Sequence, residues 1–389
     1  MKIQLSISRA RLGLKPVDAV ARPRIPRRMA SSGLARALSH TRSPSVSASF
    51  TRPTRRRGRA LTTMASPSLT VVESFTKVSR DIVRDRAASS ASSSTSSSTL
   101  AGCEYEIVRA RRASGKGPRV FVVPGNPGCA AFYATFAKAL CDELDAASVD
   151  VVGYLGHTKA ERRGRSEWFS LDEQKSHVCE YIDRCCDDEA SEPVVVVGHS
   201  IGAHLALHAM SELGFDRVSG VVGLMPFLHV NTQSTLQSSL SFVTRLSVVV
   251  HALGRFLDAL RFAAPGVRLA LLKNTVTKSM DSAAADITSA WLRWQSLINM
   301  VFMGRTEFAQ LTTPVSECAL VRRGADNGRF VAVYAHDDHW APFHQRDALA
   351  ALDVDVVTVD DVSVRHDFVV NDAAAELVAK QTAKLAHRF

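Results

Sequence analysis

A run of four valines followed directly by a Gly-x-Ser-x-Gly motif constrains the fold of this chain more than any other stretch. Residues 194–197 are continuously apolar and β-branched, as in a strand that is buried on both faces of a parallel sheet. Gly198, Ser200 and Gly202 form the motif, and residues 201–213 then follow a helical pattern. A nucleophile elbow requires this order, because its serine occupies a strained strand-to-helix turn and its glycines let strand and helix approach each other. The order predicts that Ser200 is a nucleophile; the alternative is an ordinary turn in which Ser200 caps the helix.

Short apolar runs alternate with helical patterns from about residue 103 onward. The predicted strands are residues 119–123, 149–155, 194–197, 218–224, 330–335 and 354–359. The predicted helices are residues 131–144, 171–186, 201–213, 345–352 and 372–387. Such alternation predicts an α/β domain with a doubly wound, mostly parallel sheet.

A long insertion, about residues 225–329, separates two of these strands and has no obvious strand of its own. Insertions of this length are usually lids or caps. Apolar residues recur in it at helical spacing: Leu246, Val249, Val250, Leu253, Leu257 and Leu260. This stripe either packs on the main domain or makes the cap segment 240–272 a lipid-binding surface; the arginines around it are Arg245, Arg255, Arg261 and Arg268. No stretch offers eighteen apolar residues without a charge, so no transmembrane helix is predicted.

A serine hydroxyl is a poor nucleophile at its ordinary pKa, so the elbow implies a base and an orienting carboxylate. In this type of fold both follow the serine, the acid before the histidine, at the ends of later strands. The predicted strand 330–335 is followed by two candidate acids, Asp337 and Asp338. His366 lies after the last predicted strand and before the last helix, which is the position expected for the base.

Several other titratable residues have simpler interpretations. The stretch His336-Asp337-Asp338-His339 consists of residue types that bind metals. Consecutive side chains point in divergent directions, however, so we predict solvated charges around one functional acid, with no metal and no cofactor. The residues predicted to face solvent or to be structural are Asp360, Asp361, His157, His177, His199 and His204.

An oxyanion hole is expected to use the backbone N–H that follows the nucleophile, that of Ile201, and one N–H from the loop after an early strand. That loop has the sequence Pro-Gly-Asn-Pro-Gly at residues 124–128. Pro127 has no N–H, so the backbone of Asn126 is the expected second donor. Gly125 and Gly128 are the glycines of this turn, and the alternative is a plain Pro/Gly turn with no such role.

The positive charge of the chain is confined to its N-terminal part. Residues 1–65 contain fifteen Lys or Arg and one acid, Asp18, so their net charge is +14. The whole chain has a net charge of +10, so the remaining residues carry −4. This leader is rich in Arg and Ser and lacks the apolar core of a secretory signal, which predicts an organellar transit peptide on a protein that is not secreted. Its serine content favours a plastid over a mitochondrion, and both organelles remain open. The alternatives are a disordered basic arm and a nucleic-acid or nuclear-import patch.

Residues 66–102 are predicted to be a largely disordered linker, because residues 87–99 are only Ala, Ser and Thr. The folded domain is then predicted to span residues 103–389. The seven cysteines are odd in number and have no Cys-x-x-Cys spacing, which indicates a reducing compartment without a disulfide framework.

These motifs together resemble the lipid droplet-associated hydrolase family, and the likeness is collinear over roughly residues 103–389. The residues that carry it are Pro124-Gly125-Asn126-Pro127-Gly128 with Phe132-Tyr133, Gly198-His199-Ser200-Ile201-Gly202-Ala203, Tyr334, Asp338-His339-Trp340-Ala341-Pro342, and His366 with Phe368. Gly156-His157 and the helix that contains Leu171, Gln174 and His177 also resemble it. The family usually has glycine where His339 stands.

The resemblance implies an α/β-hydrolase fold and a serine esterase acting on neutral lipid esters, such as sterol esters or acylglycerols, in lipid storage. It implies association with the lipid droplet through the apolar cap segment. Carried over by position, Ser200 is the nucleophile, Asp338 the acid and His366 the base, and Asp338 is favoured over Asp337 because it stands two residues before Trp340.

Other functions share some of these features. A catalytically silent lipid-surface module of the same fold has no need of an intact Ser, Asp and His. Transfer of an acyl group to an alcohol uses the same residues as hydrolysis. A nucleic-acid partner is not predicted, because the folded part is net negative and has no basic stripe with interleaved aromatic residues.

Overall fold

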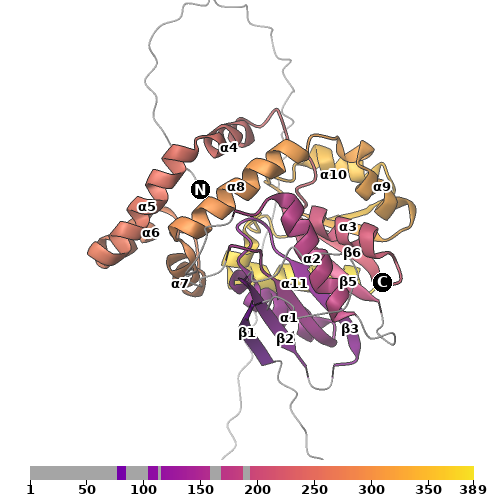
Figure 1. The fold of residues 1–389 in the computed structure, drawn as a ribbon. Helices are drawn as coiled ribbons and strands as arrows, with labels where there is room; N and C mark the ends of the chain where they lie inside the picture. The colour runs from indigo at the N-terminus through magenta and orange to yellow at the C-terminus, as the bar shows by residue number, and fades with distance from the viewer. Residues whose placement is uncertain (1–76, 85–103, 113–114, 158–167, 187–192) are drawn as a thin grey trace, which may run out of the picture. The chain divides into compact units, whose positions relative to one another are not determined.

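A computed structural model describes residues 77–84, 104–112, 115–157, 168–186 and 193–389 (Figure 1). The predicted leader, residues 1–65, lies outside the described residues, as does the Ser-rich stretch 87–99.

One sheet organises the described part of the chain, with strands in the order β1-β2-β4-β3-β5-β6-β7-β8. The strands are β1 (Lys77–Arg84), β2 (Glu104–Arg111), β3 (Gly117–Val123), β4 (Ala146–Val152), β5 (Val194–His199), β6 (Val218–Leu224), β7 (Phe330–Tyr334) and β8 (Asp355–Thr358). The pairs β1–β2 and β2–β4 are antiparallel, and the remaining pairs are parallel. Every residue of β5, β6 and β7 is buried, which explains their continuous apolar runs.

The predicted α/β fold is confirmed, and all six predicted strands are present within a few residues of the predicted bounds. Two strands were not predicted. β1 lies inside the predicted linker 66–102, so that prediction is wrong for residues 77–84. β2 starts at residue 104 and pairs with β1. β1 is the edge strand, and β2 lies between β1 and β4 and pairs antiparallel with both. Both strands have charged residues between apolar ones, and neither has the continuous apolar run that marks the parallel strands.

The helices of the sheet domain fall into two groups. The short η1 (Ala130–Tyr133) leads into α1 (Ala134–Glu143), which packs against the C-terminal α11 (Asp372–Ala386). The second group contains α2 (Leu171–Cys185), α3 (Ile201–Leu213) and α9 (Ala319–Asp326), with α3 between the other two. α10 (Phe343–Ala350) contacts β8, and η3 (Phe368–Val370) precedes α11.

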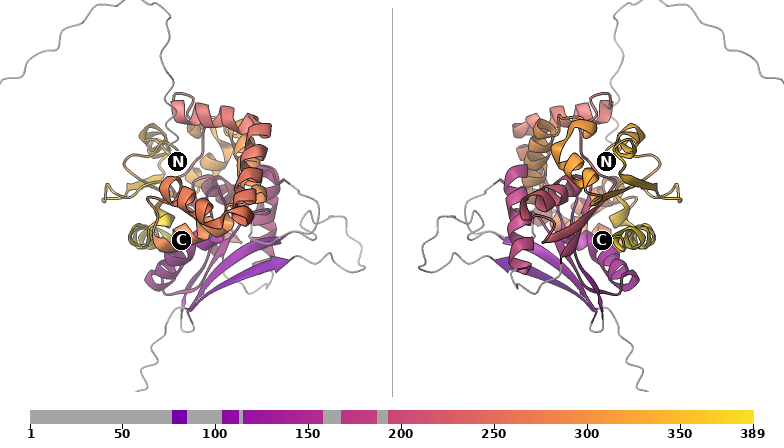
Figure 2. Two further views of the ribbon diagram at one scale, coloured as in Figure 1. Left: turned by 90° about the vertical axis from the view of Figure 1, so that its left-hand side faces the viewer. Right: turned by 90° about the vertical axis from the view of Figure 1, so that its right-hand side faces the viewer.

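The insertion after β6 is helical, and Figures 1 and 2 show its helices together on one side of the sheet domain. They are α4 (Thr235–Arg245), α5 (Ser247–Ala263), α6 (Pro265–Thr275), α7 (Ser282–Trp291) and α8 (Trp294–Gln310). We call these five helices the cap. The predicted insertion 225–329 is too long at its C-terminal end: after η2 (Val315–Glu317), α9 packs on α3 and β7 of the sheet domain.

Polar contacts attach the cap to the sheet domain. The side-chain amide of Gln237 in α4 donates to the backbone carbonyl of His339 at 2.7 Å. The indole N–H of Trp291 in α7 donates to the carbonyl of His157 at 2.7 Å. Both bonds are partly or fully buried, where hydrogen bonds are less weakened by competition with water. The cap is therefore held at several points around the ends of the parallel strands.

The turn from β5 into α3 depends on close backbone contact. A Cβ on Gly202 would lie 2.2 Å from the carbonyl oxygen of Val123, and a Cβ on Gly198 would lie 2.4 Å from the carbonyl oxygen of Gly202. Real side chains do not approach backbone atoms so closely, so both positions require glycine. This packing brings the N-terminus of α3 directly against the end of β3.

We expect Gly202→Ala to destabilise the protein by at least about 1–3 kcal/mol, because β3 or α3 must shift to admit the methyl group. Gly266→Ala is the matched control. It places the same methyl group in α6 with no heavy atom within 4 Å, and alanine favours a helix over glycine by about 1 kcal/mol. Urea unfolding of both variants provides the comparison, and equal stabilities would contradict the close packing described.

Candidate active site

Ser200 lies between the end of β5 and the start of α3, in a backbone conformation with φ of 55° and ψ of −124°. Residues other than glycine rarely have positive φ, and strain of this kind is characteristic of functional turns. The backbone N–H of Ser200 donates to the carbonyl of Leu224 at 2.9 Å, and its carbonyl accepts from the N–H of Phe227 at 3.0 Å. These bonds hold the strained residue between β6 and the segment after it.

The structure brings Ser200, His366 and Asp338 into one line of hydrogen bonds. Ser200 Oγ lies 2.9 Å from His366 Nε2, and His366 Nδ1 lies 2.7 Å from Asp338 Oδ2. Asp338 follows β7, and His366 lies in the loop between β8 and η3. Parallel strands end at the same edge of the sheet, so residues 166 positions apart meet there. Of the two candidate acids, only Asp338 contacts His366; the side chain of Asp337 is exposed.

Asp338 is stabilised as a carboxylate. Burial raises the pKa of this carboxyl, but the adjacent His366 and two backbone N–H donors outweigh the effect, so its pKa lies below the ordinary value. The donors are Trp340 at 2.8 Å and Ala341 at 3.2 Å, both to Oδ1. Oδ2 is thus left for His366 Nδ1–H. A charged carboxylate in this place orients the imidazole ring of His366.

The turn after β3 lies against Ser200. The N–H of Gly128 donates to the carbonyl of Gly125 at 2.7 Å, and Gly128 has a φ of 67°. A Cβ on Gly125 would lie 2.9 Å from Ser200 Cβ. Among the described residues, no hydrogen bond uses the backbone N–H of Asn126 or of Ile201.

Comparison with known proteins identifies the family. The model of the lipid-droplet associated hydrolase family matches residues 116–369, which include all of the residues above. The chain belongs to this family. It is 24% identical over 247 residues to the lipid droplet-associated hydrolase of Dictyostelium discoideum, covering 61% of this chain and 77% of that protein. It is 24% identical over 275 residues to that of Gallus gallus, covering 67% and 82%.

A solved structure supports the same fold. The peroxisomal α/β-hydrolase Lpx1 of Saccharomyces cerevisiae aligns over 81% of this chain and 90% of its own, with a TM-score of 0.53 and 13% identity. At this identity the likeness shows the fold alone. The predicted α/β-hydrolase fold is confirmed, and so is the resemblance to the lipid droplet-associated hydrolases.

In this family member, the cap reaches the turn after β3 through a contact that the sequence did not indicate. The side-chain amide of Asn126 donates to Glu307 Oε1 and to the carbonyl of Met300, both at 3.0 Å and both in α8. Glu307 is buried, and burial raises the pKa of its carboxyl to about 8 even though the bond from Asn126 lowers it. Glu307 stands in a helical stretch with no motif, so only the folded structure reveals the contact.

The other His and Asp residues considered from the sequence are either exposed or buried in structural positions. His336 and His339 are exposed, and so are Asp360 and Asp361. His157 and His177 are buried and bind backbone carbonyls, those of Pro127 and Gly153, respectively. His204 is buried in α3. Among the described residues, no three His, Cys, Asp or Glu side chains group as metal ligands.

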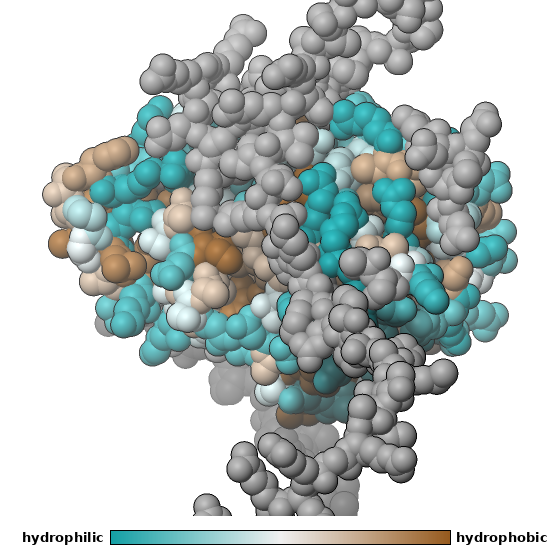
Figure 3. All heavy atoms as spheres, turned by 90° about the horizontal axis from the view of Figure 1, so that it is seen from below, coloured by the Kyte–Doolittle hydropathy of each residue, from teal (hydrophilic) through white to brown (hydrophobic). Residues whose placement is uncertain are grey.

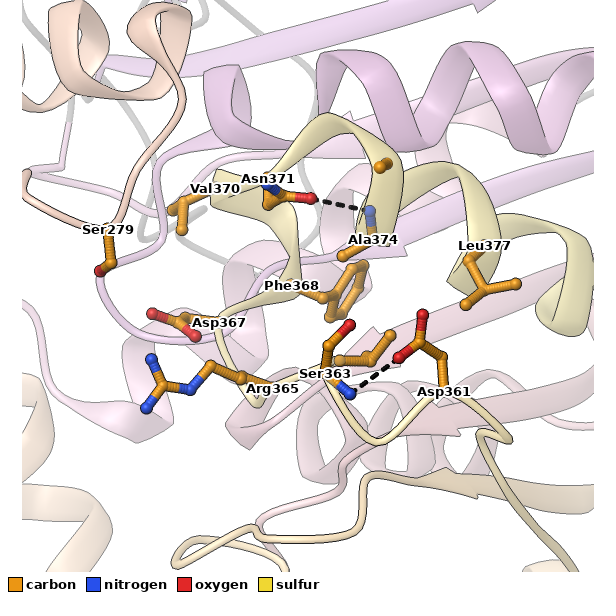
Figure 4. A pocket seen from close by; sticks show the side chains of 12 residues that line it. Ser279, Asp361, Ser363, Arg365, Asp367, Phe368, Val370, Asn371, Ala374 and Leu377 are labelled. Atoms are coloured by element: carbon orange, nitrogen blue, oxygen red, sulfur yellow. Dashed lines mark hydrogen bonds between the residues drawn. The ribbon is translucent and has the colours of Figure 1, made fainter.

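A pocket of about 300 Å³ lies beside the loop between β8 and η3 (Figure 4). Arg365 and Asp367, the neighbours of His366 in sequence, line it together with residues of the start of α11. Neither Ser200 nor His366 is among its lining residues. We therefore place the reacting centre outside this pocket.

The raised pKa of Glu307 predicts a pH dependence of stability. The folded protein holds this proton while the unfolded chain, with a pKa near 4.5, releases it. The stabilisation is thus present below pH 4.5 and is lost as the pH rises through about 8. Glu307→Gln does not titrate and keeps an acceptor for Asn126. As the pH rises from 5 to 8, the free energy of unfolding of this variant should therefore increase relative to that of wild type by on the order of a few kcal/mol.

Urea unfolding at a series of pH values between 5 and 9 measures this difference. Glu317→Gln, which changes an exposed glutamate of η2, is the control and should follow the wild-type curve. Parallel curves for Glu307→Gln and wild type would contradict the raised pKa.

Proposed function

We propose that this chain is a serine hydrolase that cleaves carboxylic esters of neutral lipids, sterol esters or acylglycerols, through an acyl-enzyme. The observation that carries the proposal is the hydrogen-bonded line from Ser200 Oγ through His366 to the buried Asp338, with the serine on a strained strand-to-helix turn. Membership of the lipid-droplet associated hydrolase family supports the hydrolytic chemistry.

The geometry suits acyl transfer in two stages. Ser200 Oγ attacks the ester carbonyl while His366 Nε2 takes its proton, and Asp338 stabilises the imidazolium that forms. The tetrahedral intermediate collapses, and His366 returns the proton to the departing alcohol, leaving the acyl group on Ser200. Water then attacks the acyl-enzyme with His366 again as the base, which releases the acid and restores Ser200.

We assign the oxyanion hole to the backbone N–H groups of Ile201 and Asn126. Ile201 is the first residue of α3, where N–H groups lack partners within the helix and the helix dipole favours negative charge. Asn126 lies in the turn that contacts Ser200, and its side chain is anchored to the cap. Donors held in place before the reaction stabilise the developing charge without reorganisation.

Aromatic side chains around His366 fit an apolar acyl group. Trp340 lies 6.2 Å from the ring of His366, and Phe227 lies 5.3 Å from Trp340 in an edge-to-face arrangement. Phe308 of the cap helix α8 lies 6.2 Å from both Phe227 and Trp340. Sheet domain and cap thus contribute together to an apolar wall beside the reacting groups, as expected for binding a fatty acyl chain.

We expect a fluorophosphonate probe to label the wild-type protein on Ser200 and Ser200→Ala to remain unlabelled. Asp338→Asn should lower the rate of hydrolysis of a lipid ester by about 10⁴-fold, because the imidazole loses its orientation and its partner charge. Asp337→Asn is the matched control and should retain wild-type activity, because Asp337 is exposed and does not contact His366. Labelling and ester hydrolysis by the three variants test the assignment.

Two other outcomes of these experiments would contradict the proposal. A folded wild-type protein that binds droplets but takes no label would support a lipid-surface module without catalysis. Equal losses in Asp337→Asn and Asp338→Asn would contradict the assignment of the acid.

The cap also presents apolar side chains to solvent. They lie on α4, α5 and α6 and on the break between α4 and α5: Phe242, Val243, Leu246, Val248, Val249, Leu253, Phe256, Phe262, Val267, Leu269 and Leu271. We call this set the apolar cap face. Hydrophobic spheres gather at the end of the molecule where α5 and α6 lie (Figures 1 and 3). Soluble proteins rarely expose so many large apolar groups together unless the surface binds something.

Only part of the predicted apolar stripe faces inward. Val250 and Leu257 are buried in α5, which packs on α8, and Gly254 between them lets Trp294 approach. Leu253 on the same helix is exposed. Arg268, one of the arginines that the lipid-binding alternative placed around the stripe, is buried and donates to the carbonyls of Ser289 and Leu292. α5 therefore has two apolar sides, one in contact with the protein and one exposed.

We propose that the apolar cap face binds the lipid monolayer of a droplet. Arg245, Arg255 and Lys273 are exposed on the same helices, where they would meet lipid head groups. Among the described residues, no single helix is long and apolar enough to cross a membrane; α4 and α5 together meet the criteria of length and composition, but they bend by 82° at their junction.

Replacing Phe242, Val248 and Phe262 by serine should weaken binding to artificial triacylglycerol droplets coated with phosphatidylcholine. These side chains are 62%, 79% and 76% exposed, so their loss leaves the core intact while each removes about 1–2 kcal/mol of transfer free energy. The triple variant should bind about 100-fold more weakly or worse. Flotation of full-length protein with droplets measures the effect.

The matched control is Val362→Ser, an apolar residue that is 72% exposed in the loop after β8, outside the cap. Its binding to droplets should equal that of wild type. Undiminished flotation of the triple variant would exclude the apolar cap face as the binding surface.

A further inference from the structure

Two buried side chains connect the turn after β3 with the loop that carries His366. The N–H of Gly125 donates to the hydroxyl oxygen of Tyr133 at 2.8 Å. The Tyr133 hydroxyl lies 2.6 Å from His199 Nδ1, and His199 Nε2 lies 2.9 Å from the backbone carbonyl oxygen of His366. The chain of hydrogen bonds thus begins at the residue before Asn126 and ends on the backbone of the proposed base.

The two ends of this chain determine the direction of every hydrogen bond in it. The carbonyl of His366 can only accept, so His199 carries its proton on Nε2. His199 Nδ1 is therefore an acceptor, and the Tyr133 hydroxyl donates to it. The same hydroxyl oxygen accepts from Gly125 N–H, so each bond has one donor and one acceptor.

Burial keeps the His199 ring neutral and the Tyr133 hydroxyl protonated. Burial and, to a lesser extent, the nearby His366 lower the pKa of His199 to about 3, so His199 stays neutral in the folded protein at ordinary pH. Burial also raises the pKa of the Tyr133 hydroxyl far above its usual range. The rings are packed as well: His199 lies 5.0 Å from the ring of Phe368 and 5.1 Å from that of His366.

We propose that Tyr133 and His199 are positioning residues, which hold the turn after β3 (residues 124–128, with the proposed oxyanion donor Asn126) and the backbone of the base at fixed distances on either side of Ser200. The inference rests on the proposed function. Three separate segments meet here: η1 supplies Tyr133, β5 supplies His199, and the loop after β8 supplies His366. Gly125 and His366 lie in different loops, and no helix or strand contains both. The hydrogen bonds through Tyr133 and His199 therefore fix the position of one loop relative to the other.

Neither residue touches the reacting atoms through its side chain, so its effect is on the geometry of the transition state. The turn that Tyr133 holds leads directly into Asn126, the proposed oxyanion donor. Removing one oxyanion donor outright costs about 10²–10³-fold in kcat. Loosening its support without removing it should cost less, and KM should change little, because the apolar wall beside His366 remains intact.

The experiment compares three variants of the full-length protein. Tyr133→Phe removes the hydroxyl and should lower kcat by roughly 10-fold with KM nearly unchanged. His199→Gln places an amide N–H near the site of Nε2 and keeps the bond to the carbonyl of His366, whereas His199→Asn places an amide oxygen near the site of Nδ1 and keeps the bond from Tyr133. Each should retain more activity than His199→Ala, which keeps neither bond.

Tyr181→Phe is the matched control. It also removes a buried tyrosine hydroxyl, one that accepts from Arg109 and donates to Asp150 away from Ser200. It should reduce stability without lowering kcat. Equal effects of Tyr133→Phe and Tyr181→Phe on kcat, or conservative His199 variants no better than His199→Ala, would overturn the proposal.

Nitrogen-15 NMR of the ring of His199 tests the arrangement independently of activity. At neutral pH the wild-type protein and Ser200→Ala should both show a neutral ring protonated on Nε2; protonation on Nδ1 would overturn the proposal even with an active enzyme. If wild type proves inactive towards esters and the probe, the proposed function fails by itself, while the NMR result still decides whether Tyr133 and His199 make the connection.

Discussion

The strained backbone of Ser200 is the constraint on which the rest of the site depends. A serine with positive φ is unfavourable in isolation, and here packing maintains it. Gly198 and Gly202 let β5, α3 and the end of β3 approach until backbone atoms are in contact. Because β3 leads directly into the turn of Gly125 and Asn126, the same contact places that turn beside the serine. One packing arrangement thus determines the positions of the nucleophile and of the proposed oxyanion donors.

Buried polar groups then link this centre to segments far along the chain. Asp338 binds His366 and two backbone N–H groups, Asn126 binds the cap, and Tyr133 binds His199. An unpaired polar group is costly away from water, so each of these contacts favours one arrangement of its segments over nearby alternatives. The cap is consequently joined to the turn of Gly125 and Asn126, and it exposes apolar side chains elsewhere. This arrangement suits the proposed function, in which the substrate lies in a lipid surface.

The parts of the molecule that could be predicted are those with short-range signals. The parallel strands show as continuous apolar runs because both of their faces are covered, and the elbow shows as glycines at fixed spacing. β1 and β2 could not be predicted in the same way, because charged residues interrupt their apolar residues and leave no continuous apolar run. The cap shows as apolar helices, but which side is buried depends on α8. Arg268 illustrates the limit: its charge suggested the surface, and the carbonyls it binds lie on α7 and just after it.

By itself, the sequence determined the class of fold, the serine and the order in which an acid and a histidine must follow, because local packing rules require glycine and apolar residues at particular spacings. The residues alone left both Asp337 and Asp338 as candidate acids, and the family resemblance favoured Asp338. The tertiary structure shows Asp338 in contact with His366, since adjacent residues at the end of a strand point in different directions. It alone joined Glu307 to Asn126 and Tyr133 to His199, because hydrogen bonds between distant segments leave no periodic pattern in the chain. Such bonds form only where folding has already brought their partners within about 3 Å.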